Sequence, residues 1–582
     1  MIKDISVMIA GQAGDGVLFT GNVLAKILKK EGWEVATYRY FPSNIRGEPT
    51  HYTIRASQKK VFGLGNKINV LLSFDCASII KYTKLMAQGG VVFCDGEELN
   101  RLKPIHKKGK TFHKLPLRIL TQKHFKNEIF KNTIALGALC FVLDLNFRII
   151  ERIIIDTFLK RKGKEIVRKN IEALNLGCEQ ARMIVDSSER HTLIKKKDKG
   201  KMFISGDEAI AVGALAAGCR FFAAYPICPA TEIWQWLALH FPKFNGLVVQ
   251  TEDELSAINM ALGASYAGAR AMTSTSGPGG SLMMESYGLS GMAEIPIVVV
   301  SVQRVGPSTG MPTKSEQSEL NQWVFGSHGE FPRIVLSPGT IDECFDFTVK
   351  AFNLADKYQV PVVLLTELDF GQNYRTVKRF DLSKIKIDRG KLLSEEKLKS
   401  VNNYKRYAFT PNGISPRALP SMKNGIHMVE SNEHDEKGYR DENPENRIRM
   451  MQKRMSKLSF AEKDMIPPKL WGDHKATVGI IGFGSTLGPV VEAVEELYDL
   501  NIRAKNLQIR TVCPFPVDAA SDFIQSCEFV FVVENNYSGQ LHDLIHSQVK
   551  PKTRMNKILN YSSVAFRSVD ISNHIKGAIR DV

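Results

Sequence analysis

The chain has 582 residues, 43% of them hydrophobic and 24% charged, which is a globular composition and a length sufficient for roughly three or four domains. No apolar run approaches the ~20 residues of a membrane span, and the start, MIKDISVMIAGQAGDG, does not resemble a signal peptide, so we expect a cytoplasmic protein without membrane contact. The net charge of +17 is scattered and comes with no helix-turn-helix, zinc-finger or RNP pattern, so we expect no nucleic-acid partner.

A first α/β block is predicted over residues 1–193. It opens with a strand, ISVMIA, turns through GQAGDG and continues as a helix, FTGNVLAKILKKEG, an order that indicates a parallel α/β unit. The runs NVLLSFD and GGVVFCD are expected to be further buried strands, and a helix around EIVRKNIEALNLGCEQA closes the block. Residues 194–201 are lysine-rich and are predicted to form a solvated linker.

A second α/β block is predicted over residues 202–372. GDEAIAVGALAAG has the composition of a helix, and GLVVQTEDELSAINMALGASYAGA that of a strand followed by a long helix. TSTSGPGGSLMMES is expected to be a glycine-proline loop that opens another helix, while IPIVVVSVQR and YQVPVVLLTE are expected to be buried strands.

Residues 373–470 are charged and poor in strand patterns, which predicts a surface excursion with a helix near its end. Within it, His434, Asp435 and Glu436 are polar neighbours that we interpret as a solvated loop, not as a metal site. Residues 471–582 return to the strand and helix pattern with ATVGIIGFGS, PVVEAVEELYDL, IRAKNLQIRTV and CEFVFVVENN. The predicted fold class is therefore α/β, with three α/β domains.

The glycine turn GQAGDG places Gly11, Gly14 and Gly16 between a strand and a helix. Backbone amides at such a turn can hold an anion at the helix N-terminus. The spacing G-x-x-G-x-G differs from the dinucleotide fingerprint, however, and a tight turn that lets helix and sheet pack closely explains it equally well. Both interpretations remain open at this point.

The acidic run Glu252, Asp253, Glu254 lies where a predicted strand ends and a helix begins. Any of the three can simply complement the helix dipole. A carboxylate that is buried there instead has a raised pKa and can share a proton with a heterocycle nitrogen. Glu254 lies one helical turn before Ile258 on the apolar face, so we choose it as the candidate.

Two further segments contain candidate binding residues. Arg304 lies at the end of a predicted strand, followed by Thr309 and Thr313 in a glycine-proline loop. An arginine in that position is suited to a bidentate contact with a carboxylate, although a structural ion pair is the alternative. In AAYPICPATEI, Pro226 and Pro229 restrict the backbone, which predicts a rigid loop that presents a side chain.

These segments together resemble one family. YPICPATE resembles the YPITPS-type loop of 2-oxoacid:ferredoxin oxidoreductases. ELSAINMALGASYAGA, TSTSGPGGSLMMES, QRVGPSTGMPT, GISPRALP and NEHDEKG look like the alpha subunit of the 2-oxoglutarate-type enzymes. GQAGDGV and YFPSNIRGEP are similar to the gamma domain fused to many such subunits, and GFGSTLGPVVEAVEEL and VVENNYSGQL resemble the transketolase C-terminal-type domain. The resemblance covers nearly the whole chain in family order.

The resemblance implies an enzyme that oxidatively decarboxylates a 2-oxo acid, most closely 2-oxoglutarate, to an acyl-coenzyme A and carbon dioxide while reducing ferredoxin. Thiamine diphosphate would bind between the pyrimidine-binding domain at 202–372 and a separate beta subunit. That partner would carry the diphosphate site, Mg²⁺ and a [4Fe-4S] cluster, in a hetero-oligomer of the (alpha-beta)₂ type. The nine cysteines of this chain fit that division, since no two form a C-x-x-C pair.

The resemblance also implies roles for individual residues. Glu254 would hydrogen-bond the aminopyrimidine ring, with the loop at Tyr225 and Pro226 beside the cofactor. Arg304 and Thr313 match positions that hold the substrate carboxylate region. The same loop would present Cys228 to the substrate, where threonine is usual in the family; a thiol is the poorer hydrogen-bond donor and can react with oxidants.

The N-terminal glycine turn departs from the family's GQGGQG, because Ala13 and Asp15 replace two residues of the pattern. Gly11, Gly14 and Gly16 are the expected cofactor contacts of this block. A carboxylate at position 15 disfavours a coenzyme A phosphate nearby, so contacts of this turn with coenzyme A stay open.

Four alternatives remain. The substrate can instead be pyruvate, a branched-chain or an aryl 2-oxo acid, or the chain can be a non-catalytic subunit of the same fold. A third alternative is a self-sufficient thiamine enzyme, since Gly14-Asp15-Gly16 followed by Asn44 has the spacing of a Mg²⁺–diphosphate motif, although its context differs. Nucleic-acid binding ranks last.

Overall fold

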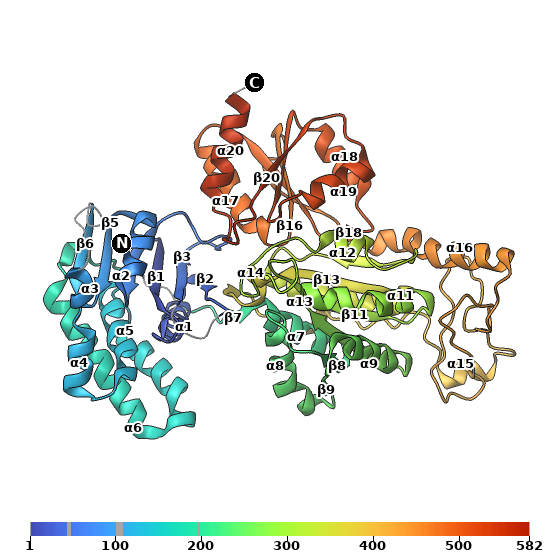
Figure 1. Cartoon of the computed structure of the whole chain (residues 1–582), viewed down its shortest axis with the longest axis horizontal. Helices are drawn as coiled ribbons and strands as arrows, with labels where there is room; N and C mark the ends of the chain where they lie inside the picture. The colour runs from blue at the N-terminus through green and yellow to red at the C-terminus, as the bar shows by residue number, and fades with distance from the viewer. Residues whose placement is uncertain (1, 44–47, 101–108, 195–197, 581–582) are drawn as a thin grey trace. The chain divides into compact units, whose positions relative to one another are not determined.

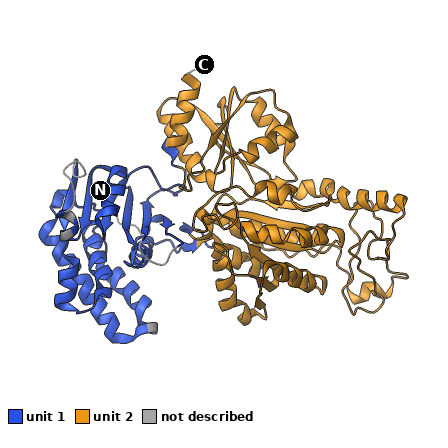
Figure 2. Cartoon of the chain, viewed as in Figure 1, with its two compact units in different colours: residues 1–204, 373–379, 567–569 blue, residues 205–372, 380–566, 570–582 orange. Residues whose placement is uncertain are grey.

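The computed structural model of the chain describes residues 2–43, 48–100, 109–194 and 198–580. The chain divides into two compact units, which are treated separately (Figure 2). The first comprises residues 1–204, 373–379 and 567–569, and the second residues 205–372, 380–566 and 570–582. Strands and helices alternate along both units (Figure 1), which confirms the predicted α/β fold class. Within the described ranges, no helix is sufficiently long and apolar to cross a membrane.

The first unit is built on an eight-stranded sheet. In spatial order its strands are β6 (Lys110–Lys114), β5 (Met86–Cys94), β4 (Ile68–Ser73), β1 (Asp4–Gln12), β3 (Pro49–Ser57), β2 (Glu34–Tyr40), β14 (Tyr374–Val377) and β7 (Met202–Ser205). The half from β1 to β6 is parallel, as the sequence predicts. The other half is not, because β3 pairs antiparallel with both β1 and β2.

Six α-helices are described in the first unit: α1 (Val17–Lys30), α2 (Cys76–Tyr82), α3 (Gly96–Asn100), α4 (Leu117–His124), α5 (Lys131–Val142) and α6 (Phe147–Ile184), which is kinked at Gly163. The helices α5 and α6 pack directly against each other. A Cβ on Gly177 would lie 1.9 Å from the carbonyl oxygen of Ile134, and one on Gly137 would lie 2.2 Å from that of Leu174. Glycine on both helices therefore permits their backbones to touch.

A seven-stranded sheet forms the first layer of the second unit. Its spatial order is β18 (Thr511–Cys513), β12 (Ile334–Leu336), β13 (Pro361–Glu367), β11 (Ile297–Gln303), β10 (Arg270–Thr275), β8 (Cys219–Ala224) and β9 (Leu247–Gln250). All its pairings are parallel except that of β18 with β12. The helices that accompany it are α7 (Gly206–Ala216), α8 (Thr231–His240), α9 (Glu254–Tyr266), α10 (Gly277–Leu282), α11 (Met284–Met292), α12 (Leu320–Phe325), α13 (Ile341–Tyr358) and α14 (Leu368–Gly371).

A five-stranded sheet completes the second unit. It runs β15 (Lys469–Gly472), β17 (Ala504–Ile509), β16 (Val478–Phe483), β19 (Phe529–Glu534) and β20 (Met555–Leu559), with helices α17 (Leu487–Asp499), α18 (Val517–Gln525), α19 (Gln540–Val549) and α20 (Ser568–Arg580). One hydrophobic cluster spans both sheets of this unit, since Val299 and Leu365 share it with Ile481 and Val532. The two sheets of the second unit therefore share one hydrophobic core, although their strands are far apart in the sequence.

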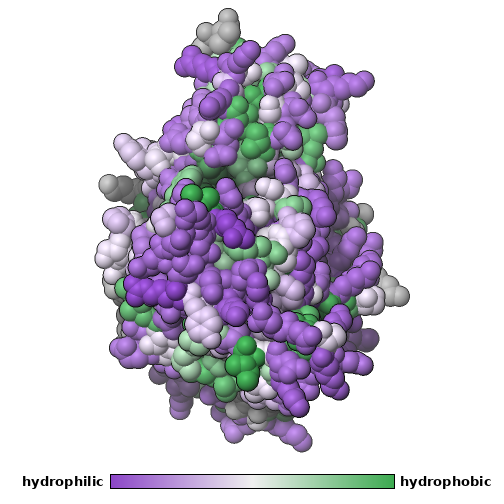
Figure 3. All heavy atoms as spheres, turned by 90° about the vertical axis from the view of Figure 1, so that its right-hand side faces the viewer, coloured by the Kyte–Doolittle hydropathy of each residue, from purple (hydrophilic) through white to green (hydrophobic). Residues whose placement is uncertain are grey.

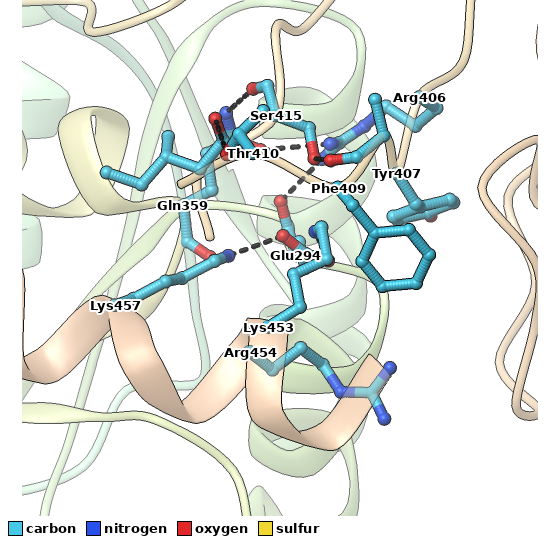
Figure 4. A network of polar contacts seen from close by, with 12 residues as sticks. Glu294, Gln359, Arg406, Tyr407, Phe409, Thr410, Ser415, Lys453, Arg454 and Lys457 are labelled. Carbon is cyan, nitrogen blue, oxygen red and sulfur yellow. Dashed lines mark hydrogen bonds and ion pairs between the residues drawn. The ribbon is translucent and has the colours of Figure 1, made fainter. Parts of the chain in front are cut away.

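The charged segment between the two sheets contains α15 (Glu395–Lys399) and α16 (Pro444–Ala461). The side of the unit on which α15 and α16 lie is mainly hydrophilic, with apolar residues in separate patches (Figure 3). Some of its charged residues nevertheless point inward. Lys453 and Lys457 of α16 both pair with the buried Glu294 (Figure 4). Arg389 and Arg417 pair with the buried Asp356 of α13.

The prediction that residues 434–436 form a solvated loop is wrong for His434, which is fully buried. Its Nδ1 lies 2.9 Å from the carbonyl oxygen of Asn432, and its ring centroid lies 4.0 Å from that of Tyr407. Asp435 accepts hydrogen bonds from the amides of Lys437 and Tyr439. The three polar neighbours thus form a turn whose histidine packs inward. No periodic pattern in the sequence predicts this burial.

Candidate active site

Four parallel strands of the second unit bring most of the predicted site residues to one edge. β9, β8, β10 and β11 run side by side and parallel. Their carboxyl ends lead to Glu254, to the Tyr225 loop, to Gly277 and to Arg304, respectively. In open α/β sheets, ligands bind outside the carboxyl ends of the strands. This edge is therefore the candidate active site.

Glu254 is the first residue of α9, and its side chain is buried, with 5% of the residue exposed. Its neighbour Asp253 caps the helix by accepting a hydrogen bond from the amide of Ser256 at 2.7 Å. Burial raises the pKa of the Glu254 carboxyl, and the charge of Asp253 adds to the shift, whereas the guanidinium of Arg304 opposes it. A carboxyl with a raised pKa holds a proton more readily than an exposed one, which suits it to exchange a proton with a ligand.

The close approach of α10 to the Glu254 carboxylate depends on a glycine. A Cβ on Gly279 would lie 2.4 Å from Glu254 Oε1 and 2.2 Å from Thr275 Oγ1, so no larger residue fits there. Among the described residues, the Glu254 carboxylate accepts a hydrogen bond only from its own backbone amide. Its capacity to bind a donor on a ligand is therefore largely unused.

Arg304 follows β11 directly and is 6% exposed. Its Nη1 donates to the carbonyl oxygen of Cys228 at 2.7 Å, and its Nη2 donates to that of Thr309 at 3.3 Å. Its Nε is buried without a hydrogen-bond partner. Two backbone carbonyls thus hold the guanidinium in one orientation and leave N–H groups for an anionic ligand.

The segment Tyr225–Ala230 connects β8 to α8, as the two prolines predict. Cys228 Sγ donates to the carbonyl oxygen of Pro312 at 3.2 Å, and Gln372 Nε2 lies 4.0 Å from the same sulfur. Burial raises the pKa of the Cys228 thiol, and the nearby Arg304 only partly opposes this. The thiol form therefore dominates at neutral pH.

The remaining residues predicted for this edge differ in exposure. Tyr225 is 41% exposed and Pro226 is half-buried, both in the loop after β8. Thr313 is buried in the loop that joins β11 to α12. The same loop supplies the carbonyl of Thr309 to Arg304. Loop, arginine and cysteine thus form one connected group.

A pocket of 620 Å³ opens beside Arg304. Its walls come from four parts of the second unit, at residues 277–281, 304–308, 316–322 and 536–540. The helix α10 contributes to this pocket and also supplies Gly279 to the contact with Glu254. The short helix α10 therefore lies beside Glu254 and also lines the pocket beside Arg304.

The sequence-based analysis missed Glu319, a buried carboxylate in the wall of this pocket. It accepts hydrogen bonds from the amide of Gly277 at 2.9 Å and from that of Arg304 at 3.3 Å. The one signal in the sequence was its place in the loop that follows Arg304, in TKSEQSEL. That signal did not distinguish it from Glu316, three residues earlier.

The predicted glycine turn belongs to the first unit. Gly11 lies within β1, while Gly14 and Gly16 have positive φ values of 106° and 78° before α1. Asp15 accepts a hydrogen bond from the amide of Gln12 at 2.9 Å and forms an ion pair with Lys131 at 3.0 Å. The carboxylate of this turn is therefore neutralised within the chain.

Two places in the sequence contain residue types that can bind a metal ion: residues 434–436 and the turn at Asp15. Asn44, the partner of Asp15 in the alternative Mg²⁺ motif, lies outside the described residues. Within the described part of the chain, no group of three or more His, Cys, Asp or Glu side chains is placed to hold a metal ion. All nine cysteines are free thiols.

Three family models match consecutive parts of the chain. Residues 6–180 match "Pyruvate ferredoxin/flavodoxin oxidoreductase". Residues 212–453 match "Pyruvate flavodoxin/ferredoxin oxidoreductase, thiamine diP-bdg", and residues 476–571 match "Pyruvate:ferredoxin oxidoreductase core domain II". The candidate edge at Glu254 and Arg304 lies inside the thiamine diphosphate-binding match.

Individual proteins match over greater lengths. The alpha subunit of 2-oxoacid:ferredoxin oxidoreductase 2 from Aeropyrum pernix is 32% identical over 95% of this chain and 95% of its own length. The 2-oxoglutarate synthase subunit KorA of Methanothermobacter marburgensis is 38% identical over 59% of this chain and 90% of its own length.

A solved structure, 2-oxoglutarate:ferredoxin oxidoreductase from Magnetococcus marinus with 2-oxoglutarate, coenzyme A and succinyl-CoA bound, superposes with a TM-score of 0.93. It is 33% identical and covers 100% of both chains. From these matches and the site geometry together, the chain belongs to the family of 2-oxoacid:ferredoxin oxidoreductase alpha subunits and carries a thiamine diphosphate-binding domain.

Proposed function

We propose that this chain is the catalytic alpha subunit of an enzyme that decarboxylates 2-oxoglutarate oxidatively to succinyl-coenzyme A and carbon dioxide, with ferredoxin as electron acceptor, in the cytoplasm. Residues 1–193 would be a fused gamma-type domain, 202–372 the pyrimidine-binding domain and 471–582 the transketolase C-terminal-like domain, joined by a linker at 194–201 and the excursion at 373–470. The observation that carries the proposal is that a buried Glu254 and an oriented Arg304 lie at the same sheet edge.

The residues present fit the aminopyrimidine ring of thiamine diphosphate. Glu254 has a buried carboxylate with unused acceptor capacity, and Gly279 lets α10 approach it closely. When bound, thiamine diphosphate supplies the carbon nucleophile and electron sink for decarboxylation. The part of Glu254 is to exchange a proton with a ring nitrogen, for which its raised pKa suits it.

The substrate site would be formed by Arg304, Thr313 and Cys228. The guanidinium, held by two carbonyls, would bind a carboxylate of the 2-oxo acid. The choice of 2-oxoglutarate is supported by the KorA relative and by the solved relative named for that substrate. Pyruvate, branched-chain and aryl 2-oxo acids are the alternative substrates.

A beta subunit would complete the site by supplying the diphosphate-binding residues, Mg²⁺ and the [4Fe-4S] cluster, in an (alpha-beta)₂ assembly. Three apolar side chains near Glu254 are exposed: Leu255 and Met260 by 41% each, and Leu282 by 48%. They belong to α9 and α10, the helices that carry Glu254 and Gly279. Exposed apolar residues around a site are typical of a surface that a partner covers.

A substrate panel tests the proposal. The chain is purified with its co-expressed beta subunit, and kcat/KM is measured anaerobically with 2-oxoglutarate, pyruvate, a branched-chain and an aryl 2-oxo acid. We expect 2-oxoglutarate to have the highest kcat/KM. A higher kcat/KM with another 2-oxo acid would make that acid the substrate instead. No turnover with any of the acids would favour the alternative of a non-catalytic subunit.

A further inference from the structure

Glu319 connects two elements that form the candidate site. Its Oε1 accepts hydrogen bonds from the amide of Gly277 at 2.9 Å and from that of Arg304 at 3.3 Å. Its Oε2 accepts one from Ser301 Oγ at 2.6 Å. Gly277 begins α10, whereas Ser301 lies in β11 and Arg304 follows that strand directly. One carboxylate therefore fixes the helix and the strand end to each other.

The Glu319 backbone is itself anchored. Its amide donates to Gln303 Oε1 at 3.0 Å, again at the end of β11. Two residues earlier, Gln317 donates through Nε2 to Glu367 Oε1 at 2.7 Å and to the carbonyl oxygen of Phe483 at 2.9 Å. The loop that carries Glu319 is thus held by both sheets of the second unit. The backbone that carries the carboxylate is therefore fixed, and the carboxylate can hold its hydrogen-bond partners in place.

Displacement of α10 would reach Glu254. Gly277 and Gly279 lie in the same short helix, and Gly279 packs directly against Glu254 Oε1. Displacement at the other partner would reach the substrate group, because the amide held by Glu319 is that of Arg304 itself. Glu319 is therefore connected to Arg304 directly, through its amide, and to Glu254 indirectly, through α10.

The carboxylate is suited to this role because it is 5% exposed and accepts from three donors at once. Burial raises its pKa, while these hydrogen bonds favour the charged form. Removing it would leave buried N–H and O–H groups without an acceptor, a state that proteins avoid by moving the segments that carry them.

We infer that Glu319 is a positioning residue of this active site, which holds Arg304 for the substrate carboxylate and α10 for the packing of Glu254. The inference rests on the proposed function. It assigns Glu319 no contact with substrate or cofactor and no proton transfer; its effect passes through the backbone of Arg304 and Gly277.

The test uses the complex with its beta subunit and compares E319A, E319D and E319Q. E319Q keeps an acceptor oxygen for the two backbone amides. E319D keeps the charge on a side chain that is one carbon shorter, and E319A removes both the charge and the acceptor oxygens. The matched control is E343A, since Glu343 is also a buried carboxylate that accepts from a glycine amide, that of Gly339, at 2.7 Å. For each protein, KM for the 2-oxo acid, kcat, the Kd of thiamine diphosphate and the melting temperature are measured.

We expect E319A to raise KM for the 2-oxo acid and Kd for thiamine diphosphate by about tenfold or more, with a smaller fall in kcat. E319D should show an intermediate rise, and E319Q should restore values close to wild type. E343A should lower the melting temperature without changing KM or Kd, which separates positioning from a general loss of stability.

The inference is overturned if E319A has wild-type KM and Kd, or if E319A and E343A change them equally. Where E319A does not fold, E319D decides by the same criteria. These outcomes are distinct from a failure of the proposed function. If the proposed function were wrong, the wild-type complex itself would turn over none of the 2-oxo acids. In that case the Kd of thiamine diphosphate across the variants still tests the role of Glu319.

Discussion

Arg304 and Cys228 are joined by a hydrogen bond of 2.7 Å from the guanidinium Nη1 to the cysteine carbonyl oxygen. The bond connects the end of β11 to the rigid loop after β8, which are 76 residues apart in the sequence. It engages the backbone of Cys228, whereas the thiol of the same residue donates to the carbonyl oxygen of Pro312 at 3.2 Å. The loop therefore orients the arginine with its backbone, and the Cys228 side chain ties it to the loop after β11.

Replacement of Arg304 by lysine should impair substrate binding despite the conserved charge. Lysine has no planar fork and cannot hold Cys228, Thr309 and a carboxylate together. We expect KM for the 2-oxo acid to rise by roughly 10–100-fold, corresponding to about 1.5–3 kcal/mol for a charge-assisted hydrogen bond. R220K is the matched control, because Arg220 also donates to two backbone carbonyls, those of Leu215 and Cys219. An unchanged KM in R304K would contradict the assignment.

The Cys228 thiol should react slowly with alkylating reagents. Burial raises its pKa, so little thiolate is present at pH 7. We expect iodoacetamide to label it in the purified complex at least about tenfold more slowly than a free cysteine peptide. Peptide mass spectrometry over a time course measures this, with C228S identifying the labelled peptide. Labelling as fast as that of the peptide would show that the thiolate is stabilised.

Glu367 should make the stability of the second unit depend on pH. Its carboxyl is completely buried, and burial raises its pKa from 4.5 to about 7. The folded state thus holds a proton that the unfolded state releases between these two pH values. The resulting stabilisation is fully present below pH 4.5 and is lost as the pH rises through about 7.

The variant E367Q removes this titration. Between pH 5 and 7, the free energy of unfolding of the wild type should fall relative to that of E367Q by about 1.4 kcal/mol per pH unit. Urea denaturation at a series of pH values gives the difference. Parallel curves for the two proteins would show that Glu367 does not titrate in this range.

The sequence predicted the parallel core strands well because their apolar runs are long and end at glycine or acidic residues. It failed where a strand pairs outside its own block. Thr511–Cys513 joins the sheet of the second block, and Tyr374–Val377 joins the sheet of the first. Such short segments carry little hydrophobic pattern, so their pairing is decided by tertiary contacts.

The candidate site divides in the same way. Glu254 and Arg304 could be selected because each follows a strand end, where function is expected in an α/β sheet. Glu319 and Gln317 could not, because their hydrogen bonds join backbone segments that meet only after folding. His434 was misjudged for a related reason, since a histidine in a charged stretch gives no sign that it is buried.

The Glu294 cluster should be the main anchor of α16. Lys453 Nζ lies 2.6 Å from Glu294 Oε1, Lys457 pairs with the other oxygen, and all three side chains are buried (Figure 4). The two ammonium groups, with Arg406, hold the pKa of the Glu294 carboxyl well below its usual range despite its burial. E294A would leave both lysines buried without their carboxylate.

We expect E294A to lower the free energy of unfolding by about 3–5 kcal/mol. The control is E172A, which breaks the exposed pair of Arg168 and Glu172 and should cost no more than about 0.5 kcal/mol. Denaturant unfolding followed by tryptophan fluorescence gives both values. Equal losses in the two variants would mean that the buried cluster contributes no more than a surface pair.

The most direct measurement is anaerobic turnover with 2-oxoglutarate, coenzyme A, thiamine diphosphate, Mg²⁺ and a viologen dye. It compares the chain alone, the complex with the beta subunit, and the complex carrying Glu254→Gln. We expect activity only in the complex and a loss of about 10²–10⁴-fold on the substitution, because proton exchange with the cofactor ring is removed. Full activity of the Glu254→Gln complex, or turnover by the chain alone, would contradict the account.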